Sequence, residues 1–273
     1  MRFAICSEVW KTPIEETIRR AADLGFDGIE IAPFNVAADI QDVPPARRKE
    51  IRAIAADAGI EIVGLHWLLV SPPGLHLTAP DPFLRQRTCH YLAALVHFCA
   101  DLGGKLLVLG SPKQRSVAEG IGTEDAWCWA AEGLREVAET AGERRVRLLI
   151  EPLGPKETNF INTVEEALRL ARRIDHPQVG YHLDVKAMST MPEGIEGTLR
   201  RWGLGAGHFH ANEPGGLGPG MGTMNFRPII QALRESGYLG WVSTEPFDYG
   251  PDPDTVARTA LKTLREAGEQ AIG

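Results

Sequence analysis

RLLIEPL (147–153) is a short apolar run with a glutamate, Glu151, near its end. Three later segments repeat this form: VGYHLDV (179–185), AGHFHAN (206–212) and GWVSTEP (240–246). In these three segments the residues that correspond to Glu151 are Asp184, His210 and Glu245. Each run has the length of a buried strand, and the chain between successive runs has room for one helix. In a (β/α)₈ barrel the C-terminal ends of the parallel strands share one rim, so we expect these four side chains to meet there.

The N-terminal half contains four more runs of strand length: RFAICS (2–7), GIEIAP (28–33), EIVGLHW (61–67) and KLLVLGS (105–111). Between the runs, helical spacing of apolar residues predicts helices over 13–25, 45–59, 81–103, 123–142, 163–174, 226–237 and 253–268, with a short one within 192–202. This alternation predicts an α/β fold, a single (β/α)₈ TIM barrel domain over residues 1–273. An open doubly wound sheet would alternate in the same way. However, the loop SEVWKT after the first run lacks the GxGxxG motif, and eight units favour a closed barrel.

The composition of the chain limits the kinds of molecule that it is expected to bind. The chain has 273 residues, of which 44% are hydrophobic and 24% charged, and its formal net charge is −7. An acidic chain is not expected to bind nucleic acid or an anionic membrane as its main partner. The four cysteines form no CxxC pair, and the N-terminus does not have the form of a signal peptide. We therefore expect a soluble cytoplasmic protein with reduced thiols.

The four strand-end residues have the chemistry of a metal site. Two glutamates, one aspartate and one histidine make an oxygen-rich set that suits Mn²⁺, Mg²⁺ or Co²⁺ better than structural zinc. Three carboxylates buried together would repel one another unless a cation lay between them. The sequence therefore predicts one divalent metal ion, with Mn²⁺ favoured and Mg²⁺, Co²⁺ or Zn²⁺ as alternatives.

Further polar and aromatic residues are expected near the same rim. His66 and Trp67 end the third run and are candidates to bind substrate, although core packing would also suit His66. His182 and His208 are each two residues before a predicted ligand, so they face the same side one layer deeper. There they would support the ligands, and His182 is also a candidate contact to substrate. The long loops 69–82 and 213–225, rich in Gly and Pro, are expected to be lids or substrate walls.

These motifs resemble those of the xylose isomerase-like TIM barrel superfamily. The resemblance covers essentially the whole chain, and it is to the sugar phosphate isomerase/epimerase branch, notably ketose 3-epimerases of the tagatose/psicose type. The motifs that carry it are Glu-Pro-Leu at 151–153 with Glu157 six residues after Glu151, Leu-Asp ending at Asp184, His-x-x-Glu from His210 to Glu213, Glu245, and ETNFINTVEEAL (157–168).

The resemblance implies a mechanism and roles for the residues. Glu151 and Glu245 would both bind the metal and act as the acid/base pair, and Asp184 and His210 would be ligands only. One glutamate would remove a proton beside the substrate carbonyl, giving a cis-enediolate held by the metal, and the other would return a proton to the opposite face. Glu157 would contact a substrate hydroxyl, and Glu213 is a further candidate for substrate binding.

Two positions depart from the ketose epimerase pattern. Those enzymes carry a substrate-binding histidine three residues after the aspartate and an arginine six residues after the strand-seven histidine. Here Ala187 and Gly216 occupy these positions, and Lys186 is a candidate to replace part of the lost contact. The missing histidine also argues against an apurinic-site endonuclease of this superfamily.

The sequence therefore predicts a metal-dependent sugar isomerase/epimerase that acts on a small-molecule keto-sugar and forms a homodimer or homotetramer. The alternatives are a metal-dependent lyase or dehydratase acting on an inosose or keto-glycoside, a hydrolase of the endonuclease type, and a non-catalytic sugar-binding barrel. The predicted rim has no Arg/Lys cluster or phosphate loop, which disfavours a phosphorylated substrate.

Overall fold

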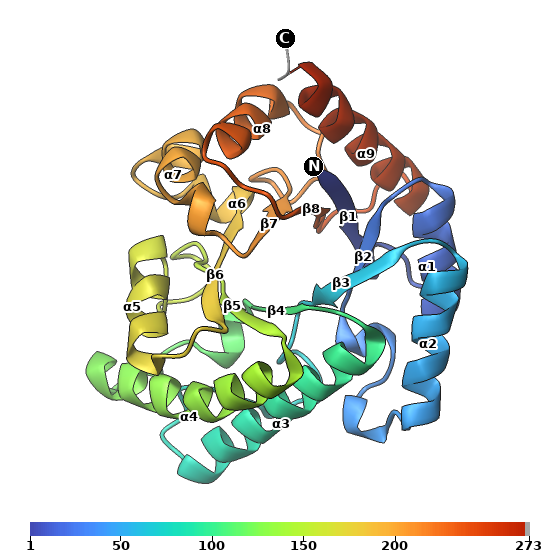
Figure 1. The fold of residues 1–273 in the computed structure, drawn as a ribbon. Helices are drawn as coiled ribbons and strands as arrows, with labels where there is room; N and C mark the ends of the chain where they lie inside the picture. The colour runs from blue at the N-terminus through green and yellow to red at the C-terminus, as the bar shows by residue number, and fades with distance from the viewer. Residues whose placement is uncertain (271–273) are drawn as a thin grey trace.

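Eight parallel strands form a closed barrel in the computed structural model, which describes residues 1–270 (Figure 1). The strands are β1 (Arg2–Cys6), β2 (Gly28–Ile31), β3 (Glu61–Leu65), β4 (Leu106–Leu109), β5 (Arg147–Ile150), β6 (Val179–Asp184), β7 (His208–Ala211) and β8 (Trp241–Thr244). Each strand pairs with the next in chain order, and β8 closes the barrel against β1. The predicted (β/α)₈ fold is confirmed.

Helices surround the barrel and cover its outer face (Figure 1). They are α1 (Ile14–Asp23), α2 (Pro45–Asp57), α3 (Pro82–Leu102), α4 (Thr123–Arg144), α5 (Val164–Ile174), α6 (Val185–Met188), α7 (Gly194–Trp202), α8 (Phe226–Glu235) and α9 (Pro253–Gln270). Short 3₁₀ turns lie in the connections: η1 (Ser7–Val9), η2 (Pro33–Asn35), η3 (Ile40–Asp42), η4 (Pro112–Gln114) and η5 (Gly203–Gly205). Over residues 1–270, none of the helices is long and apolar enough to cross a membrane.

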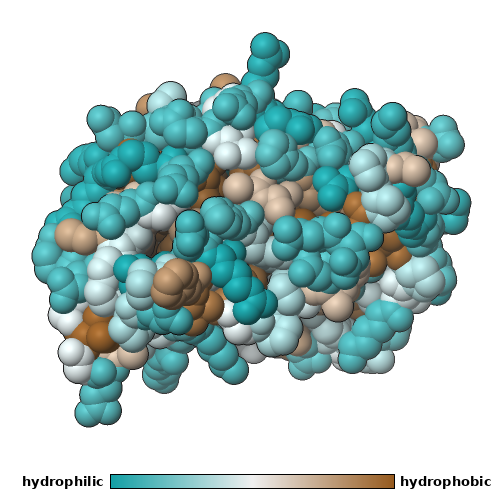
Figure 2. Space-filling view, turned by 90° about the horizontal axis from the view of Figure 1, so that it is seen from below, coloured by the Kyte–Doolittle hydropathy of each residue, from teal (hydrophilic) through white to brown (hydrophobic). Residues whose placement is uncertain are grey.

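Local signals explain where the helices begin and end. Gly25 and Gly59 have φ angles of 92° and 71°, a left-handed conformation that stops α1 and α2 where the sequence predicts. Thr163 caps α5 in a capping box with Glu166. The buried residues of α5 recur at helical spacing, so one stripe packs on the barrel and the rest meets solvent. The face of the molecule in Figure 2 is accordingly mostly hydrophilic, with apolar residues in separate patches.

The barrel interior changes character along its axis. One end is filled by a small apolar cluster of Ala4, Val63, Leu106, Val108 and Leu149. Nearer the C-terminal ends of the strands the buried side chains are polar. They include Glu30, His182, His208 and His210, each with 0% exposure. A barrel interior is normally packed with branched apolar side chains, so this polar layer marks the functional end.

The observed strands are shorter than several of the predicted runs. The run KLLVLGS predicts a strand over 105–111, whereas β4 ends at Leu109; likewise GWVSTEP extends beyond β8, which ends at Thr244. In β4 the chain leaves the sheet as soon as the apolar residues end, whereas β8 continues through Ser243 and Thr244. Glu151 and Glu245 therefore stand one residue past their strands, at the start of the loops.

Candidate metal centre and active site

The structure brings the four predicted ligands together at the C-terminal rim. Carboxylate oxygens of Glu151, Asp184 and Glu245 and a ring nitrogen of His210 all lie within 4.8 Å of one another. All four side chains are buried, with exposed fractions between 0% and 7%. They come from four consecutive strands, β5 to β8, whose parallel register brings their ends side by side.

The electrostatics of this group match a cation site. Burial raises the pKa of Glu151 well above its usual range, and the neighbouring carboxylates Glu245 and Asp184 raise it further. Burial and Glu245 raise the pKa of Asp184 to about 6. Although burial opposes it, Glu245 and Glu30 hold the pKa of His210 well above its ordinary value. A divalent cation would relieve the carboxylate repulsion, and three carboxylates with one imidazole form an oxygen-rich set suited to such an ion.

Neighbouring side chains hold the predicted ligands in place. Asp184 accepts hydrogen bonds from the backbone N–H of Ala187 at 2.7 Å and from Asn212 Nδ2 at 2.6 Å. Glu30, on β2, lies 2.7 Å from His208 Nε2 and 3.1 Å from His210 Nε2. These two imidazoles lower the pKa of Glu30 far below its usual range despite burial. Glu30 therefore supplies the buried charge that orients the His210 ring.

Glu151 is held from its backbone side by a buried arginine. Arg115, which is 1% exposed, donates to the carbonyl oxygens of Leu109 at 3.0 Å and Glu151 at 2.6 Å. A longer bond of 3.4 Å reaches the carbonyl oxygen of Ile161. Burial lowers the pKa of Arg115 to about 10. One guanidinium thus joins the end of β4 to the residue that carries the Glu151 carboxylate.

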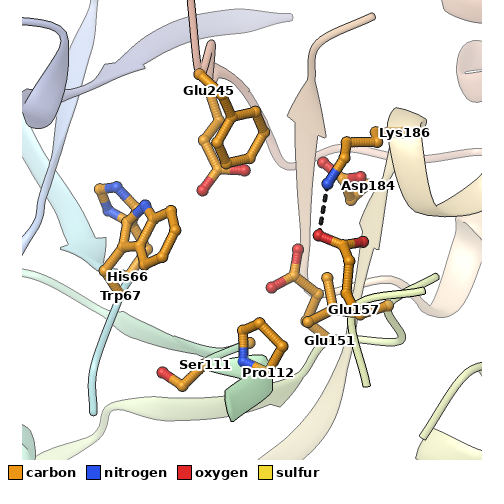
Figure 3. A pocket seen from close by; sticks show the side chains of 12 residues that line it. His66, Trp67, Ser111, Pro112, Glu151, Glu157, Asp184, Lys186 and Glu245 are labelled. Atoms are coloured by element: carbon orange, nitrogen blue, oxygen red, sulfur yellow. Dashed lines mark hydrogen bonds and ion pairs between the residues drawn. The ribbon is translucent and has the colours of Figure 1, made fainter. Parts of the chain in front are cut away.

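A pocket opens directly above the four ligands (Figure 3). Its interior offers about 40 Å³ to the centre of a water molecule, so it is a narrow pocket that opens to solvent. Glu151, Asp184 and Glu245 line it, together with Gly110, Ser111, Pro112, Leu153 and Phe247 and four of the predicted substrate-binding residues: His66, Trp67, Glu157 and Lys186. Trp67 and Phe247 meet edge to face, with ring centroids 6.2 Å apart.

The two sides of the pocket differ. Figure 3 shows His66 and Trp67 on one side and the ion pair of Lys186 and Glu157, with Asp184, on the other; the carboxylates of Glu151 and Glu245 lie between them. Lys186 Nζ is 2.5 Å from Glu157 Oε1 and 4.9 Å from the centroid of the Phe247 ring. Trp67 has a φ angle of 53°, an unfavourable value for a bulky residue. Strained backbone of this kind is concentrated at functional sites.

Two predicted substrate contacts are placed elsewhere. His182 is fully buried below the pocket, and its Nε2 is 3.7 Å from Glu151 Oε1. It therefore lies one layer beneath the ligands, where the sequence places a residue that supports them. Glu213 does not line the pocket. Its carboxylate accepts hydrogen bonds from the backbone N–H groups of Gly220, Gly222 and Met224. In this structure Glu213 stabilises the glycine-rich loop after β7, and its contact with substrate stays a prediction.

Sequence reasoning missed three charged residues of this region: Glu8, Glu30 and Arg115. Glu8 lies two residues after β1, in the turn η1, and its Oε2 is 2.7 Å from His66 Nε2. Glu30 interrupts the apolar run GIEIAP. Both positions carried a readable signal, a carboxylate at a strand end or inside a strand. Arg115 lies in a polar loop and carried none.

Gly110 leaves space for the Glu151 carboxylate. A Cβ atom at this position would overlap Glu151 Oε2, and the φ angle of Gly110 is outside the left-handed range. Gly110→Ala should therefore displace the carboxylate with little backbone strain. We expect a fall in kcat of about 100-fold, typical of a 1 Å misplacement, with a stability change below about 1 kcal/mol. The measurements are steady-state kinetics and thermal unfolding.

Gly215→Ala is the matched control for this prediction. Its added methyl group would meet no atom within 4 Å, and the residue lies in a loop on the same rim. Equal activity losses in both variants would mean that overlap with Glu151 is not the cause.

Comparison with known proteins agrees with this fold. The model of the xylose isomerase-like TIM barrel family matches residues 18–267. The chain belongs to that family. It is 30% identical over 249 residues to a D-psicose 3-epimerase of Ruminiclostridium cellulolyticum, covering 90% of this chain and 82% of the relative. It is 24% identical over 261 residues to a fructoselysine 3-epimerase of Shigella flexneri, covering 93% of each.

The fold is shared with a solved structure. A structure of L-ribulose 3-epimerase superposes with a TM-score of 0.87 over 99% of this chain and 95% of its own, at 24% identity. The relatives are named as epimerases, which are isomerases, and the enzyme class predicted from the sequence agrees with them.

Proposed function

We propose that this protein is a divalent-metal-dependent epimerase of keto-sugars, with Mn²⁺ as the favoured ion. The observation that carries the proposal is the placement of Glu151 and Glu245. Their carboxylates lie in one buried cluster but come from strands β5 and β8, and both line the same pocket. Two carboxylates on different walls of a pocket can reach opposite faces of a planar intermediate.

The side chains of the site have separate roles in this reaction. The metal, when bound by Glu151, Asp184, His210 and Glu245, would polarise the substrate carbonyl as a Lewis acid. One glutamate removes the proton from the carbon beside that carbonyl, and the other delivers a proton to the opposite face, which inverts the centre. Asp184 and His210 take no proton from substrate. Asn212 and Glu30 keep these two ligands oriented.

The far side of the pocket binds the substrate hydroxyls. Lys186 and Glu157 form an ion pair that offers both donors and an acceptor toward the cavity. The histidine and arginine of the ketose epimerase pattern are replaced by Ala187 and Gly216. The ion pair of Lys186 and Glu157 therefore supplies the polar groups on that side. Trp67 and Phe247 supply an apolar wall against which a sugar face can pack.

Lys186→Met should weaken substrate binding without stopping the chemistry. The change removes a charged donor from the pocket but keeps the length and the apolar part of the side chain. We expect KM to rise roughly 10- to 100-fold with kcat changed by less than about threefold, since a hydrogen bond to a charged group contributes roughly 1.5–3 kcal/mol. Steady-state kinetics on the best substrate give both constants. Lys156→Met, an exposed neighbour of Glu157, is the control and should change neither.

A panel of ketoses and keto-glycosides, incubated in D₂O with Mn²⁺ and the protein, tests the function. The expected result is deuterium at the carbon beside the carbonyl together with inversion of that centre. Elimination of water or of a leaving group would instead assign the protein to the lyases. A ligand that binds without any exchange would indicate a non-catalytic sugar-binding barrel. Either of these results would contradict the proposal.

A further inference from the structure

A second group of ligand-type side chains lies on the other half of the rim. Cys6 Sγ, a ring nitrogen of His66 and carboxylate oxygens of Glu8 and Glu245 all lie within 4.8 Å of one another. We call these four residues the second cluster. Three of them come from the ends of β1 and β3, outside the strands β5 to β8 that carry the first site. Glu245 belongs to both groups.

These four side chains are buried and incompletely paired. Cys6 is 0% exposed, His66 1%, Glu245 7% and Glu8 9%. His66 Nε2 is 2.7 Å from Glu8 Oε2. Glu8 Oε1 is buried and has no hydrogen-bond partner within residues 1–270, whereas His66 Nδ1 lies 3.9 Å from Glu30 Oε1, outside the second cluster. A buried polar atom without a partner is costly, so Glu8 Oε1 points to something that the protein chain itself does not supply.

We infer that the second cluster is a further metal site, which takes a borderline-soft divalent cation such as Zn²⁺ or Co²⁺. One thiolate, one imidazole and two carboxylates are ligands that these ions accept in a four-coordinate site. The first site contains no sulfur, so the two sites differ in the ions they prefer. Metal binding would deprotonate the Cys6 thiol, because the thiolate is the ligand.

Metal binding would require the cluster to contract while its shortest contact opens, because its ligand atoms lie up to 4.8 Å apart. Bonds of about 2.0–2.1 Å to nitrogen and oxygen at a tetrahedral angle place two ligand atoms about 3.3 Å apart. The contact between His66 and Glu8 would therefore open by roughly half an ångström, within reach of small side-chain rotations. Glu245 can serve both sites through one shared oxygen, which leaves its other oxygen free to carry a proton, and the metals of two-metal sites lie about 3.5–4 Å apart.

This inference goes beyond the proposed function, because one metal at the first site suffices for epimerisation. A second cation beside Glu245 would fix the orientation of that carboxylate. It would also bring an electrophile to the His66 side of the pocket, opposite Lys186 and Glu157 (Figure 3).

Cobalt spectroscopy of the whole protein tests the second cluster directly. The metal-free protein is loaded with excess Co²⁺, desalted, and assayed for cobalt content and for thiolate-to-cobalt charge transfer in the near ultraviolet. We expect two ions per chain and a clear charge-transfer band. Cys6→Ser and His66→Gln should each lower the content to one ion per chain, and Cys6→Ser should abolish the band. Cys128→Ser, which removes an exposed thiol, should change neither.

Asp184→Asn separates this inference from the proposed function. Asp184 belongs only to the first site, so the variant should lose one ion and keep the charge-transfer band. One cobalt per wild-type chain without the band would overturn the inference, as would two ions per chain that survive in Cys6→Ser. Both results concern the second cluster alone, because neither requires activity and no ligand of the first site is a thiol.

Discussion

The double variant Glu151→Gln/Glu245→Gln should lose both the metal of the first site and the activity. Glutamine keeps the size of glutamate but removes the charge, and the two residues are half of the four ligands of this site. Each is also proposed to transfer a proton, and a general acid or base contributes roughly 10²–10⁴-fold. We therefore expect epimerisation to fall by at least about 10⁴-fold. Elemental analysis of the purified variant and a D₂O exchange assay measure the two effects.

The fold should survive this change, because burying three carboxylates together is unfavourable and glutamine removes two of those charges. The control is Glu136→Gln/Glu139→Gln, which makes the same chemical change at two exposed positions of α4. That variant should keep its metal and its rate. Full metal occupancy at Asp184 and His210 in the Glu151→Gln/Glu245→Gln protein would refute the assignment of the first site.

The sequence allows the barrel and the first site to be predicted because both depend on local patterns. Apolar runs such as LLVL in β4 mark buried strands, and glycines such as Gly25 mark helix ends. Parallel strands then force all strand ends to one rim, so Glu151 and Asp184 are predicted to meet although 33 residues separate them (184 − 151 = 33). No contact needed to be known in advance.

The residues that were missed depend on partners far away in the chain. Glu30 is buried inside a strand, and its position makes sense only beside His208 and His210 on β7. For Glu213, the position in the sequence alone does not decide what the side chain contacts. Its place three residues after His210 suggests a contact with substrate, but the glycine-rich loop folds back and uses its carboxylate as an acceptor. Strand-end position predicts which residues reach the rim, whereas loop conformation decides which of them face the pocket.

Arg115→Met should destabilise the protein and also lower its activity. The change removes the hydrogen bonds to the buried carbonyl oxygens of Leu109, Glu151 and Ile161; those of Leu109 and Ile161 keep a backbone N–H donor, from Glu151 and Leu153. A hydrogen bond to a charged group contributes roughly 1.5–3 kcal/mol, and removing the cost of burying the guanidinium offsets part of the total. We expect a loss of about 3 kcal/mol in the free energy of unfolding, measured by urea denaturation.

The effect on activity follows from the position of the arginine rather than from its charge. Because Arg115 holds the backbone that carries Glu151, its loss should move that carboxylate and lower kcat by roughly tenfold to 100-fold even in the folded fraction. Arg135→Met is the matched control: its guanidinium also donates to backbone carbonyls, those of Arg173 and Ile174, but the residue is exposed. It should cost less than about 1 kcal/mol and leave kcat unchanged.

Arg115→Lys keeps the charge yet cannot make all three bonds with one ammonium group held at a single point, so it should restore only part of the stability. If Arg115→Lys matched the wild-type protein in both measurements, the charge near Glu151, and not the clamp on its backbone, would be what this arginine contributes.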